Sequence, residues 1–195
     1  LIIDLPGHGE SKGSSSNSIE YYGEFLIDAL AAYDLKDLTL CGHSMGGLIA
    51  LDMVLNHNFA AKELILVNSI YPTRVADALL AKAKVGNGGA ANFIIKYGLY
   101  RRLLGMRNAF SEADDLVMLD DLDACNNYEL DLNDIKNVEI PISIILGSKD
   151  RLVDLKAVEN FTDIVPSQTY TMDEVGHFSF FEDPVELSRL ISKIV

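Results

Sequence analysis

The pentapeptide Gly42-His43-Ser44-Met45-Gly46 constrains the fold of this 195-residue chain more than any other feature. It follows the apolar residues 38–41 and precedes residues 48–55, whose apolar content is typical of a buried helix. A G-x-S-x-G sequence between a strand and a helix is typical of a nucleophile elbow, a sharp turn that lifts one serine hydroxyl clear of a sheet. The glycines suit this turn, because side chains there would collide with the neighbouring strand and helix. We therefore expect Ser44 to be a nucleophile.

A serine hydroxyl is a weak nucleophile at neutral pH and needs a histidine to take its proton. The chain has four histidines, His8, His43, His57 and His177. With this motif the acid and then the histidine follow the serine along the chain. His57 falls at the end of the helix that Ser44 begins, whereas His177 lies in a loop near the C-terminus. We predict that His177 is the base; the alternative is a loop histidine that caps the helix after it.

The acid should follow a buried strand that precedes the histidine. Residues 142–146 are mostly β-branched and lead through a glycine to Asp150, which would hold the imidazole of His177 and stabilise its charged form. Asp154 is the nearest rival, but its position is that of an N-cap for a helix over residues 155–164. The preceding strand, residues 64–67, runs into Asn68-Ser69 and offers no carboxylate. Asp150 is therefore the predicted acid.

The composition is that of a folded domain, with 49% hydrophobic and 23% charged residues. The net charge of −13 repels polyanions, so we expect no nucleic-acid partner. No apolar run approaches the roughly 18–20 residues of a membrane-spanning helix. The two cysteines, Cys41 and Cys125, are isolated, and we expect two buried reduced thiols and a cytoplasmic setting. The dispersed histidines indicate no metal site.

Strand and helix patterns alternate at both ends of the chain, which predicts an α/β fold with a mostly parallel sheet covered on both faces. Between Pro72 and Pro141 the alternation stops, and helical patterns replace it. The expected strands are residues 1–4, 38–41, 64–67, 142–146 and 169–172. The expected helices of the middle segment are residues 75–85, 92–104 and 112–123, the last with Ser111 as its N-cap. Ser18 is predicted to cap a first helix, and Asp183-Pro184 to open the last one.

Four segments together resemble the α/β-hydrolase family, in its esterase/lipase-like branch with a helical cap. They are residues 5–11 (LPGHGES), the elbow at residues 42–46, residues 145–150 (ILGSKD), and residues 176–178 (GHF) with residues 182–184 (EDP) behind them. The resemblance implies a three-layer α/β/α core of residues 1–71 and 138–195. It also implies a cap, or lid, subdomain of residues 72–137 over the serine.

The chain departs from the family pattern at its start. Residues 1–4 resemble the family's fourth strand, before which members normally have three others. The loop after the third strand supplies one oxyanion donor in such enzymes, and the other is the backbone N–H after the nucleophile, here that of Met45. We therefore expect this chain to be the C-terminal three-quarters or so of a longer protein. The alternative is a truncated, non-catalytic relative that a partner strand completes.

The resemblance implies a serine hydrolase that cleaves small to medium carboxylic esters through an acyl-enzyme, without metal or organic cofactor. The same triad on this fold also serves thioesterases, acyltransferases and C–C bond hydrolases, and a non-catalytic ligand receptor or scaffold is the alternative from another class. The partner expected is a small-molecule ester, and the oligomeric state stays open. The predicted pocket residues are His43, Phe93, Tyr97, Tyr100 and Phe178; the aromatic residues of the cap could equally bury the cap against the body. His8 is expected to be structural.

Overall fold

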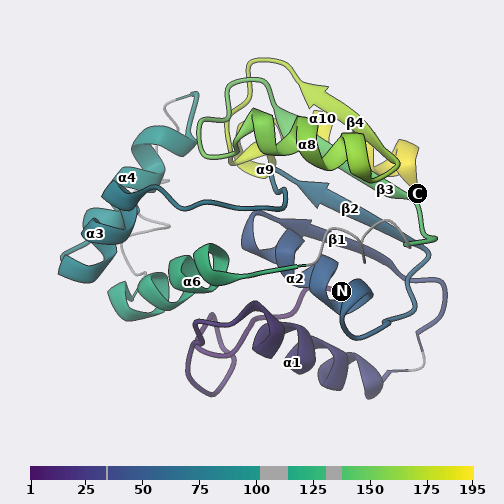
Figure 1. Ribbon diagram of the computed structural model, residues 1–195, viewed down its shortest axis with the longest axis horizontal. Coiled ribbons are helices and arrows are strands. Elements are labelled where there is room, and N and C mark those ends of the chain that lie inside the picture. The colour runs from purple at the N-terminus through teal and green to yellow at the C-terminus, as the bar shows by residue number, and fades with distance from the viewer. Residues whose placement is uncertain (34, 102–113, 131–137) are drawn as a thin grey trace.

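The computed structural model describes residues 1–33, 35–101, 114–130 and 138–195. In these residues four parallel strands form one sheet in the order β1-β2-β3-β4 (Figure 1). They are β1 (Thr39–His43), β2 (Glu63–Val67), β3 (Ile142–Gly147) and β4 (Ser167–Met172). The four strands predicted for these regions are confirmed, with ends that differ by one or two residues.

Alternate residues of the central strands face opposite sides of the sheet, as the period of a strand requires. Leu64, Leu66 and Ile144 join a large core with α2 (Met45–Leu55) and α8 (Leu155–Ile164), and α1 (Ile19–Ala31) packs on α2. Ile65 and Ile145 join a second core with α10 (Pro184–Ile194) on the other face. The sheet therefore lies between two helical layers, and the predicted three-layer α/β class is confirmed.

The predicted helix starts outside the middle segment are confirmed by their caps. The Ser18 hydroxyl accepts a hydrogen bond from the Tyr21 N–H at the start of α1, and Asp154 accepts one from the Lys156 N–H at the start of α8. Asp183 accepts from the Glu186 N–H in α10, whose first residue is Pro184. These side chains satisfy N–H groups that a helix leaves without an internal partner.

In its described residues the middle segment forms three helices, α3 (Asp77–Val85), α4 (Gly89–Gly98) and α6 (Asp115–Asn127), which share a small core of their own. They lie beyond the carboxyl ends of the strands (Figure 1). The predicted start of α6 at residue 112 is wrong, because Asp114 is extended and caps the helix by accepting from the Leu116 N–H. Ser111, the predicted cap, and residues 102–104 of the second predicted helix lie outside the described residues.

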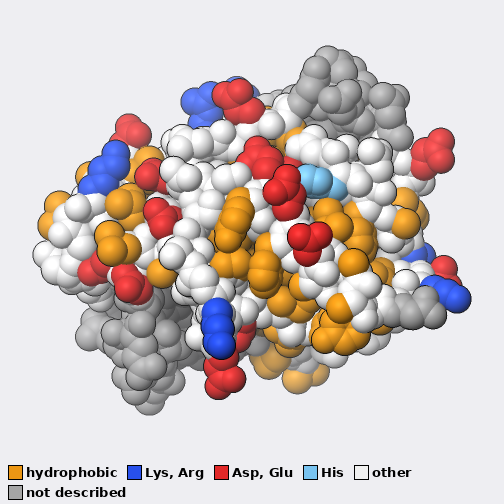
Figure 2. All heavy atoms as spheres, turned by 90° about the horizontal axis from the view of Figure 1, so that it is seen from below, with side chains coloured by type: hydrophobic (Ala, Val, Ile, Leu, Met, Phe, Trp, Pro, Cys, Tyr) orange, Lys and Arg blue, Asp and Glu red, His pale blue; other side chains and the backbone are white. Residues whose placement is uncertain are grey.

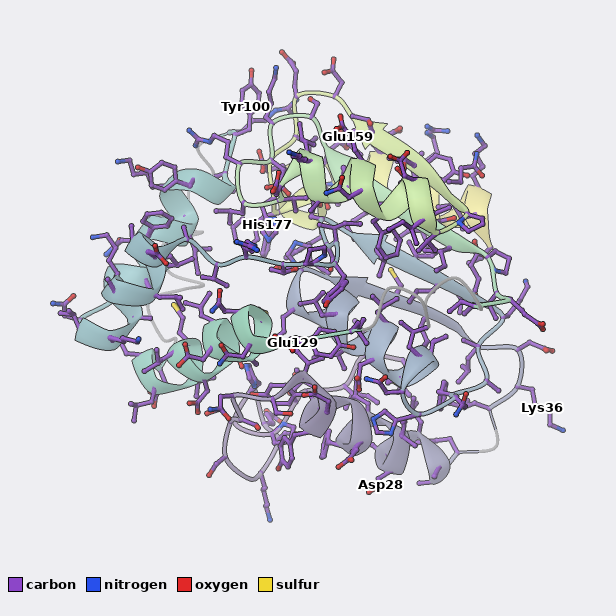
Figure 3. The ribbon with its side chains drawn as sticks, viewed as in Figure 1. Asp28, Lys36, Tyr100, Glu129, Glu159 and His177 are labelled. Atoms are coloured by element: carbon purple, nitrogen blue, oxygen red, sulfur yellow. The ribbon has the colours of Figure 1, made fainter. Side chains whose placement is uncertain are left out.

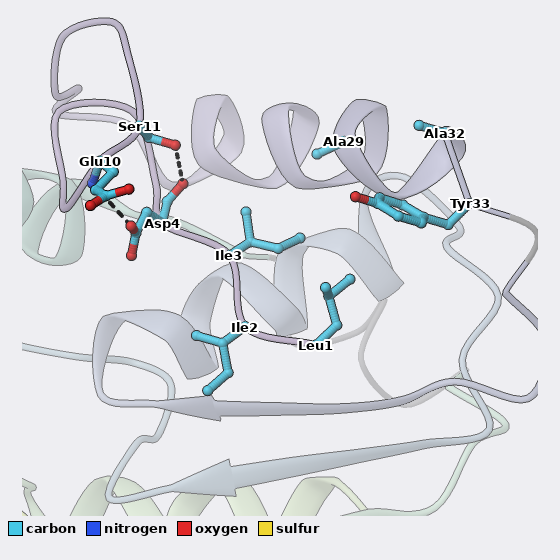
Figure 4. Close-up of a pocket in the computed structure, with 9 residues that line it drawn as sticks. All are labelled: Leu1, Ile2, Ile3, Asp4, Glu10, Ser11, Ala29, Ala32 and Tyr33. Carbon is cyan, nitrogen blue, oxygen red and sulfur yellow. Dashed lines mark hydrogen bonds between the residues drawn. The ribbon is translucent and has the colours of Figure 1, made fainter.

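The prediction of a strand over residues 1–4 is wrong. In the described part of the chain no strand lies beside these residues to accept their backbone hydrogen bonds, and β1 is the end strand of the described sheet. Leu1 and Ile2 are 81% and 96% exposed. The segment borders a shallow pocket of about 430 Å³ beside α1, where the Asp4 carbonyl accepts from the Ser11 hydroxyl at 2.7 Å (Figure 4).

Hydrophobic side chains gather on the face seen from the side of α1 (Figure 2). Several large hydrophobic residues are exposed in the N-terminal segment, in α1 and just after α1. They are Leu1, Ile2, Tyr21, Tyr33 and Leu35. Both cysteines are free thiols, but Cys41 is exposed. The expectation of two buried thiols is therefore wrong for Cys41, because β1 has no further strand beside it among the described residues. No helix in the described ranges is long and apolar enough to cross a membrane.

Candidate active site

Ser44 sits on a strained turn between β1 and α2. Its φ of 51° and ψ of −121° are unusual for a residue with a side chain. The Ser44 N–H donates to the Val67 carbonyl at 3.0 Å, and the Ser69 hydroxyl donates to the Ser44 carbonyl at 2.7 Å. These bonds to the end of β2 hold the turn in its strained form.

The turn requires glycine on one side of Ser44 more than on the other. A Cβ at Gly42 would overlap the backbone of Gly46 and Gly47, whereas a Cβ at Gly46 would meet nothing within 4 Å. A Cβ at Gly47 would collide with the Ser69 side chain. The predicted collision of a side chain is therefore confirmed at Gly42 and wrong at Gly46.

His177 joins Ser44 to Asp150 in one chain of hydrogen bonds. Its Nε2 lies 3.0 Å from Ser44 Oγ, and its Nδ1 lies 2.9 Å from Asp150 Oδ2. Because an ionised carboxylate only accepts, Nδ1 carries the proton and Nε2 is free to accept from the serine hydroxyl. The side chains of His177 and Asp150 are only 8% and 2% exposed. His177 lies where the sheet faces the helices of the middle segment (Figure 3).

Asp150 is surrounded by donors that favour its charged form. Its Oδ1 accepts from the Leu152 and Val153 N–H groups at 2.8 and 3.2 Å, and its Oδ2 also accepts from the Asn68 side-chain amide at 2.9 Å. Burial alone would raise the pKa of Asp150, but the bond to His177, the charge of His177 and these N–H donors outweigh it, so the pKa is lowered. Asp150 is thus ionised at neutral pH.

His43, a predicted pocket residue, contacts the loop that carries His177. Its Nε2 donates to the His177 carbonyl at 2.7 Å, and its ring packs on those of His177 and Phe180, with centroids 4.9 and 4.8 Å away. Burial, with the nearby His177, lowers the pKa of His43 to about 4. His43 is therefore neutral at pH 7 and acts as a hydrogen-bond donor.

A pocket of about 490 Å³ opens beside Ser44. Its wall is mostly apolar, with two carboxylates and one imidazole. It is lined by Gly7, His8, Gly9, Ser44, Met45, Ile94, Asp114, Val117, Met118, Asp121, Leu122 and Cys125. Burial and the nearby charge of Asp121 raise the pKa of Cys125 to about 12, so its thiol stays protonated.

None of the five predicted pocket residues is among these lining residues. Phe93 and Tyr97 pack against each other, with ring centroids 4.4 Å apart, and Tyr100 is 46% exposed at the periphery (Figure 3). Phe178 is buried beside the rings of His43 and His177. The aromatic side chains stack on one another or on the histidines, and smaller apolar residues of α6 form the wall instead.

The sequence predicted a cap over Ser44, but it did not predict that His8 and residues of α6 line this pocket. Asp121 Oδ2 lies 2.8 Å from His8 Nε2, and its Oδ1 accepts from the Tyr22 hydroxyl at 2.9 Å. Asp121 stands among acidic residues of α6, but its side chain is only 21% exposed and faces the N-terminal loop. The available signal was the helical spacing of Met118, Asp121 and Cys125, which places these three residues on one face of the helix.

In the described ranges no three His, Cys, Asp or Glu side chains are grouped so that they could hold a metal ion. Ser44, His177 and Asp150 come from three loops, each at the carboxyl end of a strand. The arrangement can transfer a proton from a serine hydroxyl to an imidazole backed by a carboxylate, which is the requirement for a serine nucleophile.

The sequence model of the alpha/beta hydrolase family matches residues 1–190. The chain is 24% identical over 207 residues to 3-oxoadipate enol-lactonase 1 of Acinetobacter baylyi, covering all of this chain and 77% of that protein. It is 24% identical over 221 residues to a pimeloyl-[acyl-carrier protein] methyl ester esterase of Aromatoleum aromaticum, covering 98% and 85% of the two. An esterase structure from Exiguobacterium antarcticum superposes with a TM-score of 0.87 at 19% identity, covering 98% and 79% of the two chains. The chain therefore belongs to the alpha/beta hydrolase family, and it is a hydrolase of that family.

Proposed function

We propose that this protein is a serine hydrolase that cleaves small to medium carboxylic esters, with Ser44 as nucleophile, His177 as base and Asp150 as acid. The observation that carries the proposal is the buried chain from Ser44 Oγ through His177 to Asp150, with bonds of 3.0 and 2.9 Å. The names of the relatives, an enol-lactonase and a methyl ester esterase, support ester chemistry. The mostly apolar pocket beside Ser44 supports an acyl group of modest size.

The first half of the reaction forms the acyl-enzyme. His177 Nε2 takes the proton of the Ser44 hydroxyl while Oγ attacks the ester carbonyl carbon, and the carbonyl oxygen becomes an oxyanion. Asp150 stays ionised and stabilises the imidazolium. When the tetrahedral intermediate collapses, the Nε2 proton passes to the leaving alcohol, and the acyl group stays on Ser44.

The second half of the reaction releases the carboxylic acid product from Ser44. A water molecule gives a proton to His177 Nε2 and its oxygen attacks the acyl carbon, and the collapse of this intermediate returns the proton to Ser44 Oγ. Met45 is the first residue of α2, so its N–H is among those that a helix leaves without an internal partner. This N–H is the proposed oxyanion donor, and the positive end of the helix dipole adds to it.

The helices between residues 72 and 137 are proposed to act as a cap over the core formed by residues 1–71 and 138–195. In support, α4 and α6 contribute Ile94, Met118 and Cys125 to the pocket that contains Ser44. A cap of this kind excludes water from the acyl-enzyme and shapes the acyl pocket.

Labelling with a fluorophosphonate tests the nucleophile. We expect one adduct per chain by intact mass, mapped to Ser44, and none in Ser44→Ala. Turnover of 4-nitrophenyl butyrate should be lost in Ser44→Ala and fall about 10³–10⁴-fold in Asp150→Asn and His177→Ala, with the fold intact by circular dichroism. Ligand binding without turnover or labelling would favour the receptor instead, and wild-type rates in Asp150→Asn would reject the assigned acid.

A further inference from the structure

Glu182 is a buried carboxylate that the proposed mechanism does not use. It ends the short helix α9 (Ser179–Glu182) and is 6% exposed. Its Oε1 accepts from the Gly176 N–H at 3.0 Å, and its Oε2 accepts from the Tyr100 and Arg101 N–H groups at 3.1 and 2.9 Å. An ionised carboxylate has two oxygens that only accept, so it can satisfy all three donors at once.

These three donors belong to two segments far apart in the sequence. Gly176 immediately precedes His177, whereas Tyr100 and Arg101 follow the end of α4. The two segments also touch directly, because the His177 N–H donates to the Gly98 carbonyl at 2.6 Å. A Cβ at Gly176 would collide with that carbonyl, and one at Gly98 would lie 2.7 Å from the Phe178 ring. Only glycine permits this close approach of the histidine loop to the end of α4.

The loop that carries Asp150 is fixed to the same end of α4. The Arg151 side chain donates from Nε to the Tyr97 carbonyl at 3.2 Å and from a terminal nitrogen to the Lys96 carbonyl at 2.8 Å. These carbonyls belong to the last turn of the helix, where they lack partners within the helix. The end of α4 is thus bonded to the loops of both the base and the acid.

We propose that Glu182 is a positioning residue for His177, which couples the loop of the base to the end of helix α4 in the middle segment. The inference rests on the proposed function of His177. Because Gly176 and His177 are adjacent, the bond from Gly176 to Glu182 and the bond from His177 to Gly98 fix two successive peptide groups. This fixes the direction in which the imidazole leaves the backbone, and so the alignment of Nε2 with Ser44.

Substitution of Glu182 by glutamine tests the coupling with little change in volume. Glutamine keeps one acceptor oxygen and brings an NH₂ group toward N–H donors, so either Gly176 or the Tyr100–Arg101 pair loses its acceptor. In Glu182→Gln we expect kcat per fluorophosphonate-titrated site to fall about tenfold or more with KM within about twofold. A role in overall stability alone would reduce the number of titrated sites but leave kcat per site unchanged.

Amide hydrogen exchange provides a readout that does not depend on turnover. In Glu182→Gln the amides that face the new NH₂ group, either that of Gly176 or those of Tyr100 and Arg101, should exchange about tenfold faster or more, while the strands β2 and β3 keep their protection. Glu186→Gln is the matched control, because Glu186 is a partly exposed carboxylate on α10 that pairs with Arg189 at 2.6 Å. The control should leave kcat, KM and these exchange rates unchanged.

The outcomes separate the two proposals. Wild-type turnover with unchanged kcat per site in Glu182→Gln would overturn the positioning role and leave the serine hydrolase standing. If the wild type neither turns over esters nor labels at Ser44, the proposed function fails and with it the role for Glu182. Unchanged exchange at all three amides, Gly176, Tyr100 and Arg101, would reject the coupling to the end of α4 even where kcat falls.

Discussion

Asn68 donates its side-chain amide to Asp150 Oδ2 at 2.9 Å, the same oxygen that faces His177 Nδ1. Asn68 is 1% exposed and directly follows β2, with a φ of 46° in the left-handed region. The same amide lies 3.3 Å from the Gly176 carbonyl. Asn68, which follows the strand between β1 and β3, therefore fixes both Asp150, the proposed acid, and the loop of His177, the proposed base.

Asn68→Gly should reduce kcat by about tenfold, because Asp150 loses a buried donor to its charged form. Glycine adopts a positive φ without strain, so the backbone of the turn is preserved. Steady-state kinetics on 4-nitrophenyl butyrate would measure the effect. Asn58→Gly is the control, since Asn58 is exposed and also has a positive φ, of 51°. Equal rates in both variants and the wild type would exclude this role for Asn68.

His43 should make the fold sensitive to mild acid. The pKa of His43 is lowered from 6.5 to about 4 in the folded state. The folded state therefore binds this proton less readily than the unfolded chain, and stability is full above about pH 6.5 and falls as the pH drops toward 4. We expect a loss of about 1–3 kcal/mol in the free energy of unfolding over that window, measured by urea unfolding.

The variant His43→Gln isolates this effect, because the glutamine amide can still donate to the His177 carbonyl but does not titrate. The difference in unfolding free energy between the wild type and His43→Gln should shift in favour of the variant as the pH falls below about 6.5. A difference that is constant from pH 7 to about 4.5 would show that another group causes any acid sensitivity.

Asp121 should stabilise the packing of α6 on the N-terminal loop. Its carboxylate accepts from Tyr22 and lies 2.8 Å from His8 Nε2, and the neighbouring Asp120 accepts from the Ser15 hydroxyl at 2.6 Å. Asp121→Ala leaves the buried Tyr22 hydroxyl without this acceptor, and we expect a loss of about 1–3 kcal/mol in urea unfolding. Asp123→Ala removes a carboxylate from the same helix and should cost less than about 0.5 kcal/mol.

The cost of Asp121→Ala should depend on pH. The hydrogen bond to Asp121 raises the pKa of His8, against the opposing effect of burial. The stability from this pair is therefore present below about pH 6.5 and lost as the pH rises through the raised value. The variant should be more destabilised at about pH 6 than at about pH 9. If the loss of unfolding free energy in Asp121→Ala grew with pH, an ion pair between His8 and Asp121 would be ruled out.

The sequence was sufficient to predict the meeting of Ser44, Asp150 and His177, because each follows a strand of one parallel sheet and the carboxyl ends of such strands share an edge. It was not sufficient for Asn68, Glu182 or the pair His8 and Asp121. The bonds that define these contacts join residues 82 to 113 positions apart in the sequence. They are Asn68–Asp150, Glu182–Tyr100 and His8–Asp121. No local pattern marks such contacts, which depend on how the middle helices pack.

The spacing of the aromatic residues along a helix also does not predict which of them line the pocket. Phe93 and Tyr97 have the spacing of one helix face, which predicts that they lie together but not what they face. In the structure they pack on each other, and Ile94, one residue further along, reaches the pocket beside Ser44. A rotation of one residue on a helix is about 100°, so small differences in packing decide which side chain lines a site.

The charge of the pocket beside Ser44 should decide which esters the proposed serine hydrolase accepts. Asp114 and Asp121 line the pocket among apolar side chains, and the one basic group among its described lining residues, His8, is paired with Asp121. A carboxylate on the acyl group would lose hydration and meet Asp114 without a free cation there. We expect kcat/KM for the mono(4-nitrophenyl) ester of succinic acid to be about tenfold or more below that for 4-nitrophenyl butyrate.

Asp114→Asn should reduce the ratio of kcat/KM for 4-nitrophenyl butyrate to kcat/KM for the succinic acid ester by about threefold or more. The reason is that the variant removes one negative charge from the pocket wall. Asparagine also retains an oxygen that can accept from the Leu116 N–H, so the cap of α6 is kept. Asp123→Asn changes the net charge of the protein equally and should leave the ratio of the two kcat/KM values unchanged. If both variants shift the ratio alike, the discrimination arises from the overall charge of −13, which acts on approach and weakens in salt, and not from Asp114 in the pocket.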